Sequence, residues 1–478
     1  MNAFTAAILI VLLLVVCLGS RRWALLAVMA GVFFLTQWHS VDVFGLNFYP
    51  MRFLEAAAFG RVLLRRELTR ARLNRIDWAL LLLYNYTAVV WILRSSDFTP
   101  RQFATALDPT VCYLALRSLI LDVDDLRWVL NALVVILVPY TALVLVERMT
   151  GRTAFGFAGA AQELYFRNGI PRCQGSFRHA VLLGAVAASF LSLYIGLWLG
   201  GTRRAVAVLG GALCLTLVVL SNSGGPVTAA AAVFLGWSVW PWRERMARVR
   251  RAALALLLLL VLLMKAPIWY LPFKVSGVVG GGGFYRGLLL ERAWQDLGKW
   301  WLFGMDIQET ASWTPVYVDV VGGVDVTNQF LVFGVRGGLV GILLSVGLLW
   351  FAFRGIGMAL ASQRGPENES RASALVLWGL GVALVVHSVS WLGTSYFDQS
   401  YVIWLLHVAA VSSLVQAARH PAFEPAGASL AKGRLRPPTL YAGAPVGAGT
   451  RDGRLLRPPD GCSKPLRTER HLGPWQKY

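Results

Sequence analysis

Two segments between the apolar stretches, around 148–178 and 268–327, each carry several basic residues. Each guanidinium group can donate two parallel hydrogen bonds to phosphate or carboxylate oxygens, so arginine-rich segments indicate an anionic ligand. Exposed loops also carry cations for solubility, and for any single arginine that explanation is equally good. The residues concerned are Arg148, Arg152, Arg167, Arg172 and Arg178 in the first segment, and Lys274, Arg286, Arg292 and Lys299 in the second.

Asp108 lies beside Pro109 inside an otherwise apolar stretch. An ionisable side chain within lipid is costly, which makes Asp108 a functional candidate. Capping of a helix that breaks at Asp108-Pro109 explains it equally well. His179 lies where an apolar stretch begins, and His387 and His407 lie inside apolar stretches. Single histidines at such places are more often structural, and we expect that role for all three.

The sequence lacks the motifs of several enzyme classes. It contains no P-loop, G-x-S-x-G, H-E-x-x-H or zinc-ligand spacing, so ATP-driven transport and metal-dependent hydrolysis have no support. The glycine run at 280–283 is weak evidence for a phosphate-binding loop and is more simply a hinge. No two of the five cysteines have a spacing typical of a metal site or a disulfide: Cys17, Cys112, Cys173, Cys214 and Cys462. We expect neither a metal nor a cofactor.

The composition excludes the soluble classes of protein. Of 478 residues, 56% are hydrophobic and only 15% are charged, against about 25% charged in an average soluble protein. The mean hydropathy is +0.58, and 19 Trp with 14 Tyr suit the aromatic belts at membrane interfaces. A soluble enzyme, a disordered protein and a disulfide scaffold are therefore excluded. We expect an all-α polytopic membrane protein.

A spanning helix needs about 20 mostly apolar residues, and by this measure the chain has thirteen candidates. They lie near 3–19, 23–37, 44–64, 77–93, 102–121, 127–146, 179–199, 204–221, 225–241, 252–267, 328–353, 372–391 and 399–417. The third and fifth candidates are weak, because Glu55 interrupts one and Asp108 the other. We therefore expect 12–13 transmembrane helices.

The basic residues also predict the orientation. If the N-terminus is outside, every cytoplasmic connection contains at least two Lys or Arg, in keeping with the positive-inside rule. This distribution accounts for the net charge of +20 without a nucleic-acid partner. No basic residue precedes the first apolar run, so residues 1–19 are expected to span the membrane rather than form a signal peptide.

Two parts of the chain lie outside the apolar stretches. In the predicted outer loop 268–327, residues 284–301 place apolar side chains at helical spacing. They predict an amphipathic helix at the outer interface, with Trp294, Trp300 and Trp301 as belt residues. Residues 421–478 are rich in Pro, Gly and Arg, which predicts a disordered, basic cytoplasmic tail that rests on anionic membrane lipids. The transmembrane domain is thus predicted to be 1–420.

Three segments, in this order and with this topology, resemble the O-antigen ligase and polymerase family of bacterial surface polysaccharide assembly. The first is Arg172-Cys-Gln-Gly-Ser-Phe-Arg-His179, which opens an apolar helix. The second is Leu220-Ser-Asn-Ser-Gly-Gly225, between two helices. The third comprises Tyr285-Arg286, Asp325-Val-Thr-Asn-Gln-Phe330 and Gly337-Gly338. The resemblance covers roughly 40–415 in architecture, with its motifs confined to about 170–340.

The resemblance implies a GT-C-like helical bundle with a large extracytoplasmic loop in the bacterial inner membrane. Such enzymes transfer glycan from a polyprenyl-pyrophosphate donor to a sugar hydroxyl on the outer face, without nucleotide sugar and generally without metal. The family's donor-binding arginines correspond to Arg172 or Arg178, and to Arg286. An upstream flippase and an initiating glycosyltransferase are implied as further members of the assembly system.

The sequence departs from the family in two places. Thr327-Asn328 stands where ligases usually carry His-Asn, and Asn222-Ser223-Gly224 stands where members often have Ser-Arg-Gly. Because neither Thr nor Asn accepts a proton near neutral pH, Asp325 is the substitute candidate for the base, with Asp319 weaker. An exposed loop carboxylate is an equally good explanation of Asp325. The missing His favours a polymerase of repeat units over a ligase.

The predicted site therefore has Asp325 and Arg286 in catalytic roles, and Arg172, Arg178, Arg292 and Asn328 as substrate-binding residues. In the expected mechanism the arginines hold the donor pyrophosphate, while Asp325 orients or deprotonates the acceptor hydroxyl, which inverts the anomeric carbon. The main alternative is a ligase that delivers finished glycan to lipid A core or another acceptor. Further alternatives are a peptidoglycan polymerase, whose key Asp pattern is missing, and a non-enzymatic flippase or transporter, for which we find no clear internal repeat.

Overall fold

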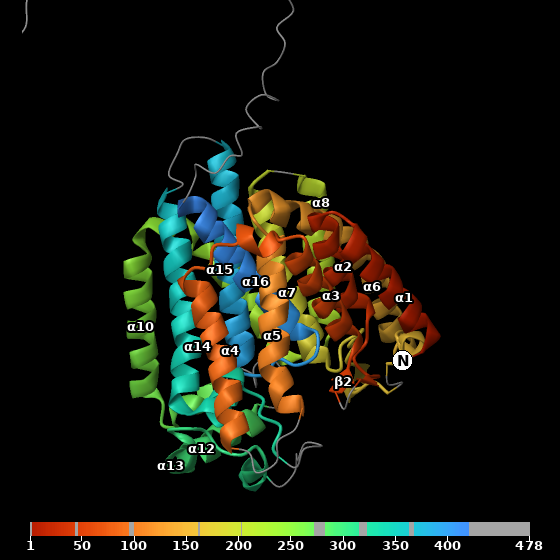
Figure 1. Ribbon diagram of the computed structural model, residues 1–478. Coiled ribbons are helices and arrows are strands. Elements are labelled where there is room, and N and C mark those ends of the chain that lie inside the picture. The colour runs from red at the N-terminus through yellow and green to blue at the C-terminus, as the bar shows by residue number, and fades with distance from the viewer. Residues whose placement is uncertain are drawn as a thin grey trace, which may run out of the picture. The chain divides into compact units, whose positions relative to one another are not determined.

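The chain is mostly helical, because apolar stretches in lipid must satisfy their backbone hydrogen bonds internally. The computed structural model describes residues 2–43, 46–94, 100–160, 163–201, 203–271, 283–314, 323–362 and 368–419 (Figure 1). The predicted tail 421–478, most of the glycine run, Lys274 and Asp319 lie outside these ranges.

The N-terminal half contains nine α-helices and two short hairpins within the described residues. The helices are α1 (Ala3–Leu18), α2 (Arg21–Phe34), α3 (Pro50–Leu64), α4 (Arg75–Arg94), α5 (Pro100–Leu119), α6 (Val123–Thr150), α7 (Ala180–Leu199), α8 (Arg204–Leu220) and α9 (Gly224–Ser238), with 3-10 turns η1 (Glu67–Arg70) and η2 (Gly156–Ala158). The antiparallel hairpins pair β1 (Val41–Val43) with β2 (Leu46–Phe48) and β3 (Phe166–Arg167) with β4 (Ile170–Pro171). Neither hairpin was predicted.

The rest of the described chain continues with η3 (Trp240–Arg245), α10 (Met246–Leu263), η4 (Ile268–Tyr270), α12 (Phe284–Gln295), α13 (Leu297–Trp300), η5 (Gln308–Trp313), α14 (Gln329–Ser362), α15 (Asn368–Trp391) and α16 (Ser400–Arg419). Each of the thirteen predicted apolar stretches coincides with one of the helices α1–α10 and α14–α16. Figure 1 shows α12 and α13 at the same end of the helices as the N-terminus.

Six of the described helices are long and apolar enough to cross a membrane: α4, α6, α7, α14, α15 and α16. The helices α1 and α8 are apolar but shorter. The prediction of a multi-pass, helical membrane protein is therefore confirmed. The predicted number of 12–13 crossings exceeds the six that meet this length and composition, and it stays a prediction.

Helix α7 lies in the middle of the bundle, with 94% of its most apolar window buried, and it packs against α8, α9 and α15. Small residues permit this close packing, as is usual between helices in membranes. Gly184 of α7 faces Pro226 in the first turn of α9, where an added Cβ would lie 2.5 Å from the proline ring. The N-terminal turns of α7 and α9 are thereby held side by side.

Helix α14 is broken near its start by Gly337 and Gly338, and Gly338 has a φ of +67°. The break lets the segment after α13 dock, because the Leu339 amide donates to the Trp301 carbonyl at 2.7 Å and the Met305 amide donates to the Val335 carbonyl at 2.8 Å. The glycines quoted for the family resemblance thus fix the segment that carries α12.

The segment that carries α12 and α13 has a small hydrophobic core of its own, built around Leu289, Ala293, Trp300 and Trp313. The predicted helix 284–301 ends at Gln295 and a short helix follows. Trp300 is 5% exposed and donates its indole N–H to the Ala293 carbonyl at 2.8 Å. Its prediction as a belt residue is therefore wrong, since burial in this core competes with the interface. Trp294, 61% exposed, remains free for that role.

Candidate functional site

The hairpin β3–β4 presents two of the predicted arginines. Asn168 and Gly169 at its turn both have positive φ, of 51° and 73°, as the tight hairpin turn requires. Arg167 lies in the first strand, and Arg172 directly follows the second and donates its amide to the Tyr165 carbonyl at 2.8 Å. The dipeptide Asn-Gly is a strong hairpin signal that our sequence reading missed.

Arg172 is anchored at the start of α9. Its Nη2 and Nε donate to the Ser223 hydroxyl at 2.9 and 3.2 Å, and this hydroxyl in turn donates to the Ser221 carbonyl. Within the described part of the chain Arg172 forms no salt bridge. Burial and the neighbouring charges of Arg167 and Arg286 lower the pKa of Arg172, although a guanidinium remains a cation at neutral pH.

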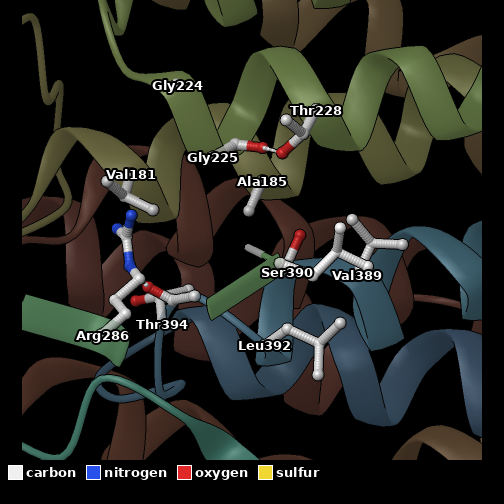
Figure 2. A pocket seen from close by; sticks show the side chains of 12 residues that line it. Val181, Ala185, Gly224, Gly225, Thr228, Arg286, Val389, Ser390, Leu392 and Thr394 are labelled. Carbon is white, nitrogen blue, oxygen red and sulfur yellow. Dashed lines mark hydrogen bonds between the residues drawn. The ribbon is translucent and has the colours of Figure 1, made fainter. Parts of the chain in front are cut away.

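Arg286 reaches from α12 toward the first turn of α7. Its Nε donates to the Gly393 carbonyl at 2.8 Å, and a Cβ at Gly393 would lie only 3.3 Å from that nitrogen. Figure 2 shows the rest of the guanidinium directed at Val181. Burial and Arg167 lower the pKa of Arg286, whereas the negative charge of Asp325 raises it.

A pocket with a volume of about 200 Å³ lies beside Arg286 (Figure 2). It is walled by the first turns of α7 and α9, by the end of α15 and by the residues that follow it. The lining residues are Val181, Ala185, Gly224, Gly225, Thr228, Leu271, Arg286, Val389, Ser390, Leu392, Gly393 and Thr394. The pocket thus brings together the partly buried Arg286 cation and the first turns of two helices, and the partial positive charge of a helix N-terminus favours an anion.

His179 caps the N-terminus of α7, and its Nδ1 accepts a hydrogen bond from the Val181 amide at 3.2 Å. Burial, followed by the charges of Arg172, Arg286 and Arg167, lowers the pKa of His179 to about 4. The imidazole is therefore neutral at physiological pH. With Nδ1 used as an acceptor, we assign the hydrogen to Nε2. The predicted structural role of His179 agrees with this capping bond.

Asp325 is exposed and lies in the segment that precedes α14. The Tyr285 hydroxyl donates to the Asp325 carbonyl at 2.8 Å, which ties this segment to the residue next to Arg286. The charge of Asp325 acts on Arg286, as noted above. The Asp325 backbone is thus tied to the helix that carries Arg286.

The other predicted binding residues lie elsewhere. Arg178 donates its Nε to the Gln37 carbonyl at 3.0 Å and pairs with Asp398 at 3.2 Å. Arg292 is exposed on α12 and bonds the Gln295 side chain at 3.1 Å. The sequence left open whether Arg172 or Arg178 binds the donor. In the structure the charge of Arg286 acts on Arg172, whereas Arg178 forms an ion pair with Asp398.

Asn328 is buried and starts α14. Its Oδ1 accepts from the Leu331 amide at 3.0 Å, and its Nδ2 donates to the Leu392 carbonyl at 3.4 Å. Since Leu392 lines the pocket, Asn328 supports the pocket wall from behind rather than facing into the pocket.

Sequence reading missed Glu147, a fully buried residue in the last turn of α6. One carboxylate oxygen accepts from the amides of Gln174 and Gly175, both at 3.0 Å. The other accepts from the Thr153 hydroxyl at 3.0 Å and the Ala154 amide at 3.2 Å. This carboxylate holds the segment between Arg172 and His179, and its position at the end of an apolar stretch gave no signal of that role.

Asp108 pairs with Arg52 at 2.8 Å. Helix α5 runs through Pro109 without ending, so of the two explanations of Asp108 the capping of a broken helix is wrong. His387 and His407 are buried and bond each other at 2.9 Å, and His387 also bonds the Tyr396 hydroxyl at 2.8 Å. Their contacts agree with the structural role predicted for them.

The described residues contain no group of three or more His, Cys, Asp or Glu side chains that could hold a metal ion. Compared with models of known families and with curated protein sequences, the chain finds no match.

Proposed function

We propose that the protein is a membrane glycosyltransferase that polymerises polyprenyl-pyrophosphate-linked oligosaccharide repeat units of a bacterial surface polysaccharide. The observation that carries the proposal is the pocket where the N-termini of α7 and α9 meet Arg286, with Arg172 anchored on Ser223 nearby. A pyrophosphate is the anion that such a site suits best, because its several oxygens can engage both guanidinium groups beside the partial positive charge of two helix N-termini.

The reaction needs stabilisation of a leaving group. The acceptor hydroxyl oxygen attacks the anomeric carbon of the donor, the bond from that carbon to the phosphate oxygen breaks, and polyprenyl pyrophosphate leaves with the bonding electrons. Arg286 and Arg172 offset the negative charge that grows on the leaving oxygen, and removal of one such donor typically costs about 10²–10³ in rate. Attack in line on the opposite face inverts the anomeric carbon.

Asp325 is the proposed base. The Tyr285 contact ties its segment to the helix that carries Arg286, and the Asp325 side chain is exposed, so that an acceptor can approach it from solvent. The carboxylate takes the proton of the attacking hydroxyl, or orients that hydroxyl by accepting a hydrogen bond. The step uses no nucleotide or metal.

The proposed setting is the outer face of the bacterial inner membrane. Lipid-linked donor is assembled in the cytoplasm, so a flippase and an initiating glycosyltransferase must act before this protein. The apolar helices that reach the pocket are consistent with a donor whose lipid tail stays in the membrane while its pyrophosphate enters the site.

The decisive experiment uses purified protein in nanodiscs with polyprenyl-pyrophosphate oligosaccharide, and separates products on a gel without nucleotide or metal. We expect a ladder of repeats from the unmodified protein. The rate of its formation should fall at least about 10²-fold in Arg286→Ala. Arg292→Ala is the matched control, because Arg292 lies on the same helix but is exposed and bonds only Gln295 among the described residues. It should retain most of the ladder.

The other outcomes of this experiment are informative. If the donor stays unchanged until lipid A core or another acceptor is added, the protein is a ligase and not a polymerase. Equal ladders from Arg286→Ala and the unmodified protein would contradict the role of the pocket.

A further inference from the structure

A second polar cluster lies next to the pocket and takes no part in the mechanism above. It contains two ion pairs, Arg52 with Asp108 at 2.8 Å and Arg178 with Asp398 at 3.2 Å. Two aromatic rings accompany them, Trp38 and Tyr49. We call these six residues the aromatic–charge cluster. Arg52 lies in the first turn of α3 and Asp108 in the middle of α5, and the other four lie in the connections after α2 and before α3, α7 and α16.

Tyr49 connects the two ion pairs. The Arg52 guanidinium carbon lies 5.5 Å from the centre of the Tyr49 ring, and the Arg178 guanidinium carbon lies 5.3 Å from it. Arg178 also lies 5.7 Å from the centre of the Trp38 ring. Such cation–π contacts hold the rings in fixed orientations. Trp38 is 37% exposed and the charged side chains are partly exposed, so a ligand can reach the cluster.

The aromatic–charge cluster lies close to the pocket beside Arg286. The segment from Gly393 to Asp398 joins them, since the Gly393 carbonyl accepts from Arg286 and Asp398 pairs with Arg178. Five residues of chain span at most about 17 Å even when fully extended. Arg178 is also the neighbour in sequence of His179, whose pKa responds to Arg172 and Arg286. An oligosaccharide of a few sugar rings bound at the cluster can therefore reach the pocket.

The charge balance of the cluster differs from that of the pocket. Its two cations are each matched by a carboxylate, so the four charged groups sum to zero. A neutral ligand rich in hydroxyl groups fits this composition. Carboxylates accept hydrogen bonds from hydroxyls, guanidinium groups donate to hydroxyl and ring oxygens, and aromatic faces contact the apolar C–H face of a sugar ring. A free anion or a hydrocarbon chain fits it less well.

We propose that the aromatic–charge cluster is the subsite for the acceptor glycan, with Trp38 as the stacking platform and Asp398 and Asp108 as hydroxyl acceptors. The assignment rests on the proposed function, because it supplies the sugar whose hydroxyl attacks the donor in the neighbouring pocket. It gives a carbohydrate-binding role to Arg178, which the sequence placed in donor binding, and to Asp108, for which the sequence left a functional role and helix capping equally open.

The test measures two affinities on the same protein in nanodiscs. The first probe is a panel of bacterial oligosaccharides that carry neither lipid nor phosphate, and its binding is measured by saturation-transfer NMR. The second probe is inorganic pyrophosphate, and its binding is measured by calorimetry. We expect Trp38→Ala and Asp398→Asn to weaken glycan binding about 10-fold or more, which corresponds to about 1.4 kcal/mol, while pyrophosphate affinity is unchanged.

Trp198→Ala is the matched control, because Trp198 is 48% exposed at the far end of α7, and it should bind both probes normally. Absence of glycan binding, or glycan binding equal in Trp38→Ala and the unmodified protein, would overturn the subsite. Loss of both affinities in Trp38→Ala would also overturn it, since the cluster would then be a structural clamp. Normal pyrophosphate binding in Arg286→Ala would instead contradict the proposed function and leave the glycan result to stand alone.

Discussion

Glu147 is a single buried residue that holds the backbone around Arg172 in place. The Glu147 carboxylate accepts four hydrogen bonds and has no described cation as partner, so its task is to hold backbone. Replacement by Gln turns one acceptor oxygen into a donor that faces donors, and an unsatisfied buried group costs about 1–3 kcal/mol. We expect Glu147→Gln to lower the melting temperature and to weaken pyrophosphate binding, because the Arg172 segment loses its support.

Thermal unfolding measures the effect of Glu147→Gln on stability. Calorimetric titration with pyrophosphate, well below the melting temperature, measures its effect on binding. Glu163→Gln is the control, since Glu163 is exposed in the same connection between α6 and α7. If Glu147→Gln melts earlier but binds pyrophosphate with full affinity, the carboxylate stabilises the fold without positioning Arg172.

His179 gives the site a pH dependence with a definite sign. Its pKa of about 4 lies below the ordinary value of 6.5, so between these values the unfolded chain binds a proton that the folded protein does not. Stability is therefore full above pH 6.5 and falls as the pH drops toward 4. Asn is also a good N-cap residue and does not titrate. We expect His179→Asn to flatten the fall of the melting temperature between pH 6.5 and 4.

Melting curves at half-unit steps of pH, in the same detergent, measure this difference. Parallel curves for His179→Asn and the unmodified protein would assign the acid sensitivity to other groups.

At the scale of elements, the break at Gly337–Gly338 decides where α12 lies. Gly338 has a φ of +67°, and a Cβ there would approach the Leu302 carbonyl oxygen to 2.3 Å. We expect Gly338→Ala to cost at least about 1–3 kcal/mol of stability and to abolish product formation, because the displaced segment carries Arg286 away from the pocket.

Gly347→Ala is the control for this prediction, since an added Cβ meets no atom within 4 Å at that position of the same helix. Removal of a glycine from a helix interior normally favours the helix by about 0.5–1 kcal/mol. Unfolding monitored by tryptophan fluorescence, together with the product ladder, compares the two variants. Equal behaviour would show that the docked segment tolerates a continuous helix.

The elements themselves were largely predictable, whereas their interruptions were not. Stretches such as 179–199 and 399–417 are apolar throughout, so the helices α7 and α16 follow from the sequence within one or two residues. The ends of α12 at Gln295 and the burial of Trp300 depend on a core assembled from distant residues such as Trp313. No local pattern contains that information. The hairpin at Asn168-Gly169 is different, because its turn signal was present and was overlooked.

At the scale of the whole molecule, the family resemblance placed Arg286 and Asp325 in one site, and the Tyr285 contact with the Asp325 carbonyl joins their two segments. The sequence could not choose between Arg172 and Arg178, which lie six positions apart and are chemically identical. Folding separates them, since one bonds Ser223 at the start of α9 and the other pairs with Asp398 before α16. The contribution of helix N-termini to the pocket was equally hidden, because it depends on how α7 and α9 pack.

The orientation in the membrane is the property on which the proposed function depends most. The distribution of basic residues predicts that α12 faces outward and the start of α8 faces the cytoplasm. In a background where Cys17 and Cys462 are replaced by Ser, a membrane-impermeant maleimide added to intact spheroplasts should label Arg292→Cys and not Arg204→Cys. Both positions are exposed in the structure, so access to solvent is comparable and only the side of the membrane differs. The reverse labelling would place the anion pocket on the cytoplasmic side, where a donor delivered by a flippase never arrives, and the polymerase and ligase functions would both fall.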